Sequence, residues 1–313
     1  MQDIQGQRFL VTGANGCIGA WVVKLLSESG AIVRAFDLGT DEHRHRLVND
    51  GGLPDVEWVH GDLTSLDDVV AAGEGVDRVI HLAALQIPFC RANPARGAAV
   101  NVSGTVHVFE AARTHGITQI AQASSIAVYG GVDDYPGGAV SAGSPRLPRT
   151  LYGVYKVACE DLAKVYWAEH GIRSVGLRPH TVFGPGRDQG MTSLPSVAIE
   201  HAVAGTPFDI DYGGVLDFQY APDVARAFVH AALVDVDGAP TYDIAGHPVG
   251  VDHFLEVITE VTGFDQLSCG TAVLPVVERA DASEWMAVGG PDPTPLVDAI
   301  TESAHIFSRK EHT

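Results

Sequence analysis

Lysine is scarce in this sequence, and positive charge as a whole is outnumbered. Only Lys24, Lys156, Lys164 and Lys310 occur, and 20 Lys and Arg face 39 Asp and Glu, which gives a formal net charge of −19 at pH 7. Nucleic acids and anionic membranes both require a positive protein surface. The composition therefore argues against both as partners, and it makes a lysine inside a motif conspicuous.

Features of membrane and secreted proteins are also missing. No apolar run reaches the roughly 20 residues of a membrane-spanning helix, and the segment Met1 to Arg8 is polar, unlike the core of a signal peptide. The cysteines at positions 17, 90, 159 and 269 show no paired spacing, which fits a reducing compartment. We therefore expect a cytoplasmic protein.

The pattern of histidines predicts no metal site. The chain has 14 of them, but no His-Glu-x-x-His motif or comparable ligand cluster occurs. His43 and His45 stand in a charged connection, where we expect them to be solvated.

The length and composition predict one large globular α/β unit. With 46% hydrophobic and 19% charged residues in 313, the chain can bury a sizeable core. We expect either a single domain or a domain with a smaller lobe attached.

The stretch Phe9-Leu-Val-Thr-Gly-Ala-Asn-Gly-Cys-Ile-Gly19 predicts a dinucleotide site. Its apolar start is typical of a buried strand, and glycines follow at positions 13, 16 and 19. One glycine permits a tight turn, one lets the backbone approach a pyrophosphate, and one lets the next helix pack closely. A helix opening near Cys17 would direct its N-terminal amides at the same place, so Asn15, Cys17 and Ile18 are expected at the cofactor.

Two acidic residues are candidates for the adenosine half of the cofactor. A second apolar strand, Ala31–Phe36, ends at Asp37, which lies 18 residues after Gly19. A carboxylate there accepts hydrogen bonds from the ribose hydroxyls and repels a 2′-phosphate, which favours NAD over NADP. Asp62 could bond the adenine amino group, but it could equally be a plain turn residue.

Strands and helices alternate along the first half of the chain. We expect further strands at Val56–His60, Arg78–Ala84, Gln119–Ala123 and Ile172–Leu177. Long helices are predicted at Ala95–His115 and Leu151–His170, and residues 130–150 read as a surface loop. This order predicts an α/β fold with a doubly wound, Rossmann-type parallel sheet. Beyond residue 264 the periodicity fades.

Tyr152-Gly-Val-Tyr-Lys156 places a phenol and an ammonium four residues apart, on one face of a helix. A phenol is a poor base at neutral pH, but a lysine one turn away favours the phenolate and lets it act as general acid/base. Lys156 could also hold the nicotinamide ribose. Ser125, at the end of a strand, could bond the reacting hydroxyl. The alternative is that this motif has no catalytic role and only places a surface lysine and a buried tyrosine on an amphipathic helix.

These motifs, in this order, resemble the extended short-chain dehydrogenase/reductases. Closer still is the resemblance to the NAD-dependent epimerase/dehydratase group, from about residue 8 to 245. The matching stretches are Thr12–Gly19, Asp62-Leu63, His81-Leu-Ala-Ala84, Ser124–Gly130, Tyr152 with Lys156, Arg178-Pro179, Phe183-Gly-Pro-Gly186, Asp217–Tyr220 and Asp223-Val-Ala225.

The resemblance implies an NAD-dependent enzyme in which Ser125, Tyr152 and Lys156 are catalytic. Ser125 is chosen over Ser124 by its place four residues before Tyr129. The expected cofactor contacts further include Leu63, Leu82, Ala83, Ala84, Asn101, Ser124, Pro179 and Thr181, besides Tyr152 and Lys156. The expected substrate contacts are Gln86, Ser125, Ile126, Tyr152, His180 and Arg187.

The resemblance also implies a division of the chain. Residues 1–178 and about 218–245 would form the NAD-binding domain, and 179–217 with 246–313 a small, mainly C-terminal substrate lobe. Two long helices that are apolar on more than one side would pair with a second copy in a homodimer.

Two positions depart from the pattern of nucleotide-sugar enzymes. Such members usually carry Asn at the position of Thr181, and Arg at the position of Leu216 to grip the diphosphate. A leucine cannot pair with phosphate, and a buried anion without a cation is unstable. Arg187 could serve a smaller anion such as a carboxylate, or be a surface charge.

The sequence thus leads to an NAD-dependent oxidoreductase acting on a secondary alcohol or ketone of a small hydroxylated substrate. That substrate could be a sugar, a sugar acid or a hydroxy acid. A nucleotide-sugar epimerase or dehydratase with tightly bound NAD is the alternative. A non-catalytic NAD-binding sensor is a third reading, which the intact Ser-Tyr-Lys set disfavours.

Overall fold

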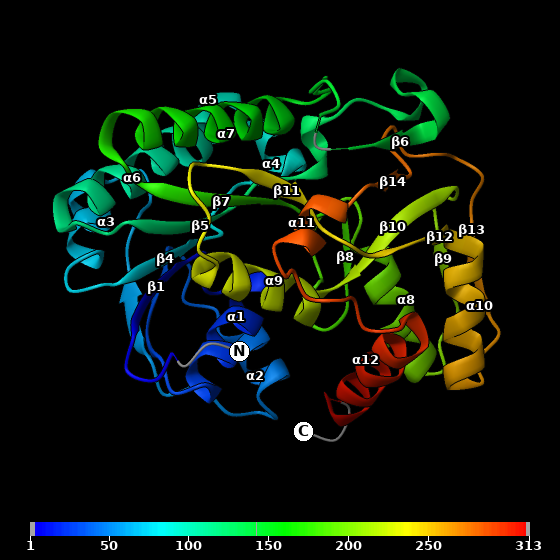
Figure 1. Ribbon diagram of the computed structural model, residues 1–313. Coiled ribbons are helices and arrows are strands. Elements are labelled where there is room, and N and C mark those ends of the chain that lie inside the picture. The colour runs from blue at the N-terminus through cyan, green and yellow to red at the C-terminus, as the bar shows by residue number, and fades with distance from the viewer. Residues whose placement is uncertain (1–3, 142, 311–313) are drawn as a thin grey trace.

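The computed structural model describes residues 4–141 and 143–310 of the chain. Its centre is a seven-stranded sheet in the order β11-β7-β5-β4-β1-β2-β3, in which all neighbours run parallel (Figure 1). The strand order reverses between β1 and β4, and ligands bind at such a switch point in doubly wound folds. The strands are β1 (Arg8–Thr12), β2 (Ile32–Asp37), β3 (Glu57–His60), β4 (Arg78–His81), β5 (Gln119–Ala123), β7 (Arg173–Arg178) and β11 (Thr241–Asp243).

Helices cover both faces of this sheet, because each parallel connection must cross over it (Figure 1). One face carries α1 (Cys17–Glu28), α2 (His43–Val48) and α9 (Ala221–Leu233), and the other carries α3 (Leu66–Ala72), α6 (Gly104–His115) and α7 (Leu151–His170). The doubly wound α/β fold predicted from the sequence is thereby confirmed.

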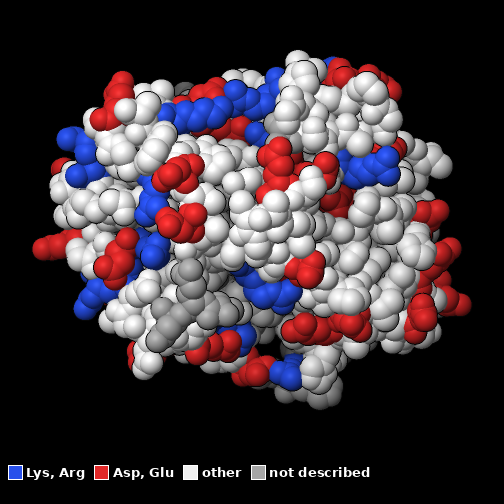
Figure 2. Space-filling model, viewed as in Figure 1, with Lys and Arg blue, Asp and Glu red and all other residues white. Residues whose placement is uncertain are grey.

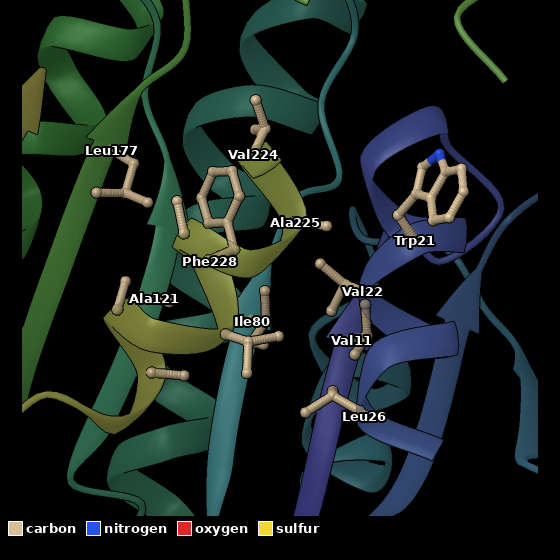
Figure 3. Close-up of a cluster of buried hydrophobic side chains, with 14 of the residues drawn as sticks. Val11, Trp21, Val22, Leu26, Ile80, Ala121, Leu177, Val224, Ala225 and Phe228 are labelled. Carbon is tan, nitrogen blue, oxygen red and sulfur yellow. The ribbon is translucent and has the colours of Figure 1, made fainter. Parts of the chain in front are cut away.

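The larger core lies between the sheet and helices α1 and α9. Figure 3 shows Val11 and Ile80 of the strands facing Val22 of α1 and Phe228 of α9, and all four side chains are fully buried. At about 25 cal/mol per Å² of buried apolar surface, side chains of this size each contribute roughly 1.5–3 kcal/mol. This packing fixes the end of β1 relative to the start of α1.

A second core fills the smaller lobe, to the right in Figure 1. Phe218 stacks on Phe254 with ring centroids 4.2 Å apart, and Phe183 meets Phe254 edge-on at 5.1 Å. The elements of this lobe are β8 (Thr181–Phe183), α8 (Leu194–Val203), β9 (Phe208–Ile210), β10 (Val215–Tyr220), β12 (His247–Gly250), α10 (Val251–Thr262), β13 (Leu267–Cys269) and α12 (Leu296–Lys310). Helix α11 (Ser283–Ala287) lies in the part of the chain predicted to form the lobe, but its Trp285 packs in the larger core instead.

Shorter elements complete the chain. Helices α4 (Ile87–Ala92) and α5 (Pro94–Ala98) follow β4, and β6 (Ala139–Val140) pairs with β14 (Arg279–Ala280). The long loop predicted at residues 130–150 therefore contains a short strand, which ties it to the C-terminal segment.

The helix expected over Ala95–His115 is present as α5 and α6, which a π-helical turn, Ala99–Ser103, joins without a break. One local prediction was wrong. His45 is not solvated, because it lies in α2 with its ring edge-on to Trp58 at 4.8 Å, fully buried. Burial lowers the pKa of His45.

Within residues 4–141 and 143–310, no helix is long and apolar enough to cross a membrane. The same residues contain no group of three or more His, Cys, Asp or Glu placed to hold a metal ion. All four cysteines are free thiols. Figure 2 shows acidic side chains gathered along the edge of the molecule where α10 lies, with both signs of charge mixed elsewhere on this face.

Candidate active site

The glycine turn between β1 and α1 has no room for side chains. A Cβ on Gly13, whose φ is +71°, would lie 2.7 Å from the Ala83 nitrogen, and one on Gly19 would lie 2.2 Å from the Gly13 carbonyl oxygen. Helix α1 begins at Cys17 after Gly16, and no side chain caps its first amides. Those amides and the positive end of the helix dipole remain available to an anion.

Asp37, the last residue of β2, lines the same cavity as the glycine turn. Its Oδ2 accepts a hydrogen bond from the Asn15 amide at 2.9 Å, and its Oδ1 accepts one from the Gly39 amide at 2.8 Å. The carboxylate is thus held beside the glycine turn, where it can still accept from ribose hydroxyls.

The nearby arginines are not disposed to bind a 2′-phosphate. Arg34 pairs with Glu57 and donates to the Ala72 carbonyl, outside the cavity wall. Arg44 donates to the Asn15 and Gly186 carbonyls and pairs with Asp188. Both guanidinium groups are already occupied, which supports the predicted use of NAD rather than NADP.

Helix α7 carries the predicted acid/base pair. It starts after Thr150, whose Oγ1 accepts from the Gly153 amide at 3.0 Å and so fixes the first turn. Lys156 is buried, donates from Nζ to the Ala123 carbonyl at 2.6 Å, and has its Nζ 5.6 Å from the centroid of the Tyr152 ring. The ammonium therefore lies between the end of β5 and the phenol.

The two serines after β5 have different surroundings. Ser124 Oγ donates to Oε1 of the buried Glu160 at 2.5 Å, and Glu160 is in turn paired with Arg178. Ser125 Oγ accepts from the Ala127 amide at 3.1 Å, so its own proton remains available to a ligand. This geometry supports Ser125 rather than Ser124 as the catalytic serine.

One cavity of about 800 Å³ brings nearly all the predicted residues together. Its volume lies in the usual range for ligand sites. The predicted residues in its wall are Gly13, Asn15, Gly16, Cys17, Ile18, Gly19, Asp37, Asp62, Leu63, Leu82, Ala83, Ala84, Gln86, Ser124, Ser125, Ile126, Tyr152, Lys156, Pro179, His180, Thr181 and Arg187.

Asn101 is the predicted site residue that does not line this cavity. Its side chain is buried in the π-helical turn, where it accepts from the Leu85 amide at 2.7 Å and donates to the Leu85 carbonyl at 2.9 Å. Asn101 thus holds the loop after β4, whose neighbouring residues form the wall. Asp62 lines the cavity, accepts from the Thr64 backbone amide in a turn and pairs with Arg96, so its adenine role stays a prediction.

Sequence reasoning missed the part of the wall that comes from the C-terminal segment. Leu274, Pro275 and Val276 close one side of the cavity, although no periodicity marks them. His180 fixes this segment by donating from Nε2 to the Val277 carbonyl at 2.8 Å, while its Nδ1 lies 3.0 Å from Thr181 Oγ1. Burial lowers the pKa of His180 to about 4, so the ring is neutral at physiological pH.

Other wall residues that were missed come from the loop after β8 and from the turn before α7. Gln189, Met191 and Thr192 follow Arg187 in the loop after β8, and Arg149 precedes α7. The residues of the loop after β8 could have been predicted, because this loop follows the end of a strand and binding residues gather at such ends.

The donor set matches NAD at each part of the cavity. The tight glycine turn and uncapped amides of α1 suit a pyrophosphate, Asp37 suits the adenosine ribose, and Lys156 suits the nicotinamide ribose. Burial raises the pKa of the Cys17 thiol to about 11, so this residue adds no negative charge beside the expected pyrophosphate.

Comparison with known proteins agrees with this geometry. The model of the NAD-dependent epimerase/dehydratase family matches residues 9–245. This chain belongs to that family. It is accordingly an NAD-dependent enzyme of the extended short-chain dehydrogenase/reductase type, as the sequence motifs predict.

Individual relatives differ in what they act on. The chain is 33% identical over 233 residues, 72% of each protein, to a UDP-glucose 4-epimerase of Mycolicibacterium smegmatis. It is 31% identical over 188 residues to a uronate dehydrogenase of Pseudomonas syringae, covering 59% of this chain and 63% of the relative. Among solved structures, MoeE5 in complex with UDP-glucose and NAD superposes with a TM-score of 0.81 at 29% identity, covering 98% of this chain and all of that one.

Proposed function

We propose that this protein is an NAD-dependent dehydrogenase that acts on a secondary alcohol of a small hydroxylated substrate, and not on a nucleotide sugar. The observation that carries the proposal is Leu216. It lies in β10, where nucleotide-sugar members usually carry arginine, and it is 1% exposed within the core of the smaller lobe. A diphosphate would find no cation at this position.

The chain's own residues suit the removal of a hydroxyl proton. Ser125 can donate a hydrogen bond to the substrate oxygen, and the Tyr152 phenolate can take the hydroxyl proton as the alcohol becomes a ketone. Lys156 places its ammonium nitrogen 5.6 Å from the centre of the Tyr152 ring. NAD, when bound, accepts the hydride that leaves the same carbon.

Epimerisation of a nucleotide sugar is the second candidate. The relative from Mycolicibacterium smegmatis, which is named a UDP-glucose 4-epimerase, favours it, as does the UDP-glucose bound to MoeE5. The same Ser125, Tyr152 and Lys156 would then oxidise and re-reduce a sugar while NAD stays bound.

One experiment separates the two. Purified protein is mixed with NAD and a panel of polyols, sugars and hydroxy acids, and NADH is followed, with and without UDP. Net NADH formation that millimolar UDP does not inhibit is the expected result. Inhibition by micromolar UDP, with cofactor bound tightly and no net turnover, would put the epimerase first.

We further propose a homodimer. Leu151, Val154 and Val165 lie on one side of α7 and are 44%, 46% and 50% exposed, although all are large and apolar. Helix α6 lies beside α7, where Phe109 stacks on Tyr166 at 4.7 Å. The exposed apolar stripe suits pairing of these helices with a second copy across a two-fold axis.

We also propose that the protein is located in the cytoplasm, because its cysteines are free thiols and its composition is acidic.

A further inference from the structure

Arg187 is a cavity arginine without an acidic partner. Its Nη2 donates to Thr192 Oγ1 at 3.3 Å, while its Nε is buried and bonded to nothing in the described part of the chain. Most other arginines in the same wall are paired, Arg44 with Asp188, Arg96 with Asp62 and Arg149 with Asp134. The one further wall arginine, Arg91, is exposed to solvent.

A half-buried cation without a counter-charge is unfavourable in the protein alone. A ligand anion would remove that penalty. We infer that Arg187, together with Gln86 and Thr192, binds a carboxylate of the substrate, so that the substrate is a hydroxy acid such as a sugar acid. This inference rests on the proposed dehydrogenase function and narrows its substrate class.

Gly190 keeps this group of side chains together. Its φ is +104°, and a Cβ there would lie 2.3 Å from Gln86 Oε1 and 3.1 Å from Arg187 Nη2. A side chain at this position would displace the ends of Gln86 and Arg187, and the positive φ favours glycine there. Ser193 Oγ donates to the Gly190 carbonyl at 2.9 Å, so the loop is held in place.

The chemistry of the three side chains suits a carboxylate. The guanidinium offers a planar pair of donors that matches the two carboxylate oxygens, and the Gln86 amide and the Thr192 hydroxyl can each donate as well. No carboxylate of the described chain forms an ion pair with Arg187 to oppose a bound anion. The carboxylate would not react, since the hydride and proton leave a separate alcohol group.

The cofactor's pyrophosphate is the other anion within reach, because the Arg187 charge acts on Cys17 at the start of α1. That anion already has the amides and dipole of α1. Arg187 also has partners away from α1, because its Nη2 donates to Thr192 and lies near the side-chain end of Gln86 beside Gly190. We therefore assign Arg187 to the substrate, and the experiment measures cofactor binding separately.

The test compares substrates that differ only in the carboxylate. Galacturonate with galactose, glucuronate with glucose, and threonate with threitol are assayed for NADH formation. Calorimetry measures binding of each acid to the enzyme–NADH complex, and of NADH to the free enzyme. Arg187→Met, Arg187→Lys and the wild type are compared, with Arg46→Met, an exposed α2 arginine outside the cavity wall, as the charge-matched control.

We expect at least one acid to be oxidised in clear preference to its neutral partner. Arg187→Met should lower kcat/KM for that acid by roughly 30-fold to several thousand-fold and leave NADH affinity within a few-fold of wild type. Arg187→Lys should recover part of the loss, because it restores the charge but not the planar fork. Arg46→Met should match the wild type.

Other outcomes separate this inference from the proposed function. If only neutral compounds are oxidised, the enzyme is a dehydrogenase but the carboxylate site is refuted. If no compound is turned over, yet an acid binds the wild type and not Arg187→Met, the site stands and the dehydrogenase proposal fails. Loss of NADH affinity in Arg187→Met, or no binding of any acid, overturns the assignment of Arg187.

Discussion

The Nζ of Lys156 lies 5.6 Å from the centre of the Tyr152 ring while it donates to the Ala123 carbonyl at 2.6 Å. One ammonium thus joins helix α7 to the end of β5. The position of the charge beside the phenol is set by the core of the protein and not by the ligand, so the pair is arranged before anything binds.

Tyr152→Phe should separate chemistry from binding. The variant keeps the ring and removes only the hydroxyl, so turnover should fall by roughly 10²–10⁴-fold. NAD affinity should survive, because Lys156 and the glycine turn remain. Steady-state kinetics and cofactor titration check both. A variant that keeps full turnover would remove Tyr152 from the mechanism.

Lys156→Met should damage both properties. It removes the charge beside Tyr152, the expected bond to the nicotinamide ribose, and the donor to the Ala123 carbonyl. Turnover and NAD affinity should therefore fall together, whereas Tyr152→Phe affects turnover alone. Lys164→Met, a change of an exposed lysine on the same helix, is the matched control. Unchanged NAD affinity in Lys156→Met would contradict the ribose role.

Asp37→Ala should weaken NAD binding and relax the discrimination against NADP. Hydrogen bonds to a charged group contribute about 1.5–3 kcal/mol, so NAD affinity should drop roughly 10- to 100-fold. The loss of repulsion should leave NADP less penalised. The ratio of kcat/KM for the two cofactors measures the effect. A wild type that prefers NADP would refute this reading of Asp37.

The dimer proposal predicts a mass of twice 33.0 kDa by light scattering at micromolar concentration. Val154→Glu places a charge in the exposed apolar stripe of α7 and should shift the protein to monomer. Lys164→Gln changes a charge on the same helix and should leave the dimer intact. A wild-type monomer would end the proposal.

Asp217 should make stability depend on pH. Its Oδ1 is buried without a partner among the described residues, and burial raises the pKa of the carboxyl to about 8. The pKa of an Asp side chain in the unfolded state is about 3.9. Between these values the folded state keeps a proton that the unfolded state has lost. The free energy of unfolding should therefore fall as pH rises, by up to about 1.4 kcal/mol per pH unit, and level off above pH 8.

Asp217→Asn removes this titration and should gain stability over the wild type as pH rises from 5 to 8. Urea unfolding at several pH values, with Asp209→Asn on the neighbouring β9 as control, measures the difference. A constant difference between Asp217→Asn and the wild type over this range would show that Asp217 is already ionised in the folded protein.

The sequence predicts best those site residues that stand at the end of a strand or the start of a helix. Gly13, Asp37, Ser125 and Tyr152 each stand at a strand end or helix start, and a doubly wound sheet collects such positions at one edge. Spacing along the chain is enough to find them. The bounds of α7 match the prediction because Thr150 and Gly171 mark its ends.

What the sequence could not predict depends on contacts distant along the chain. Leu274–Val276 reach the cavity because His180 bonds to Val277, 97 residues away. His45 is buried by packing on Trp58, which no local pattern reveals. Ser124 and Ser125 are told apart by Glu160, which accepts a hydrogen bond from the Ser124 hydroxyl.

Leu216 also bears on how such an enzyme could change its substrate in evolution. It packs with Phe218 and Phe254 in the lobe core, so an arginine there would have to be buried among apolar side chains before any diphosphate arrived to neutralise it. The protein would lose several kcal/mol of folding stability before any gain in substrate binding. A descendant could not reach nucleotide sugars through this position in one step, since the lobe would first have to open a polar path to it. Selection for folding alone would then preserve an apolar residue at this position.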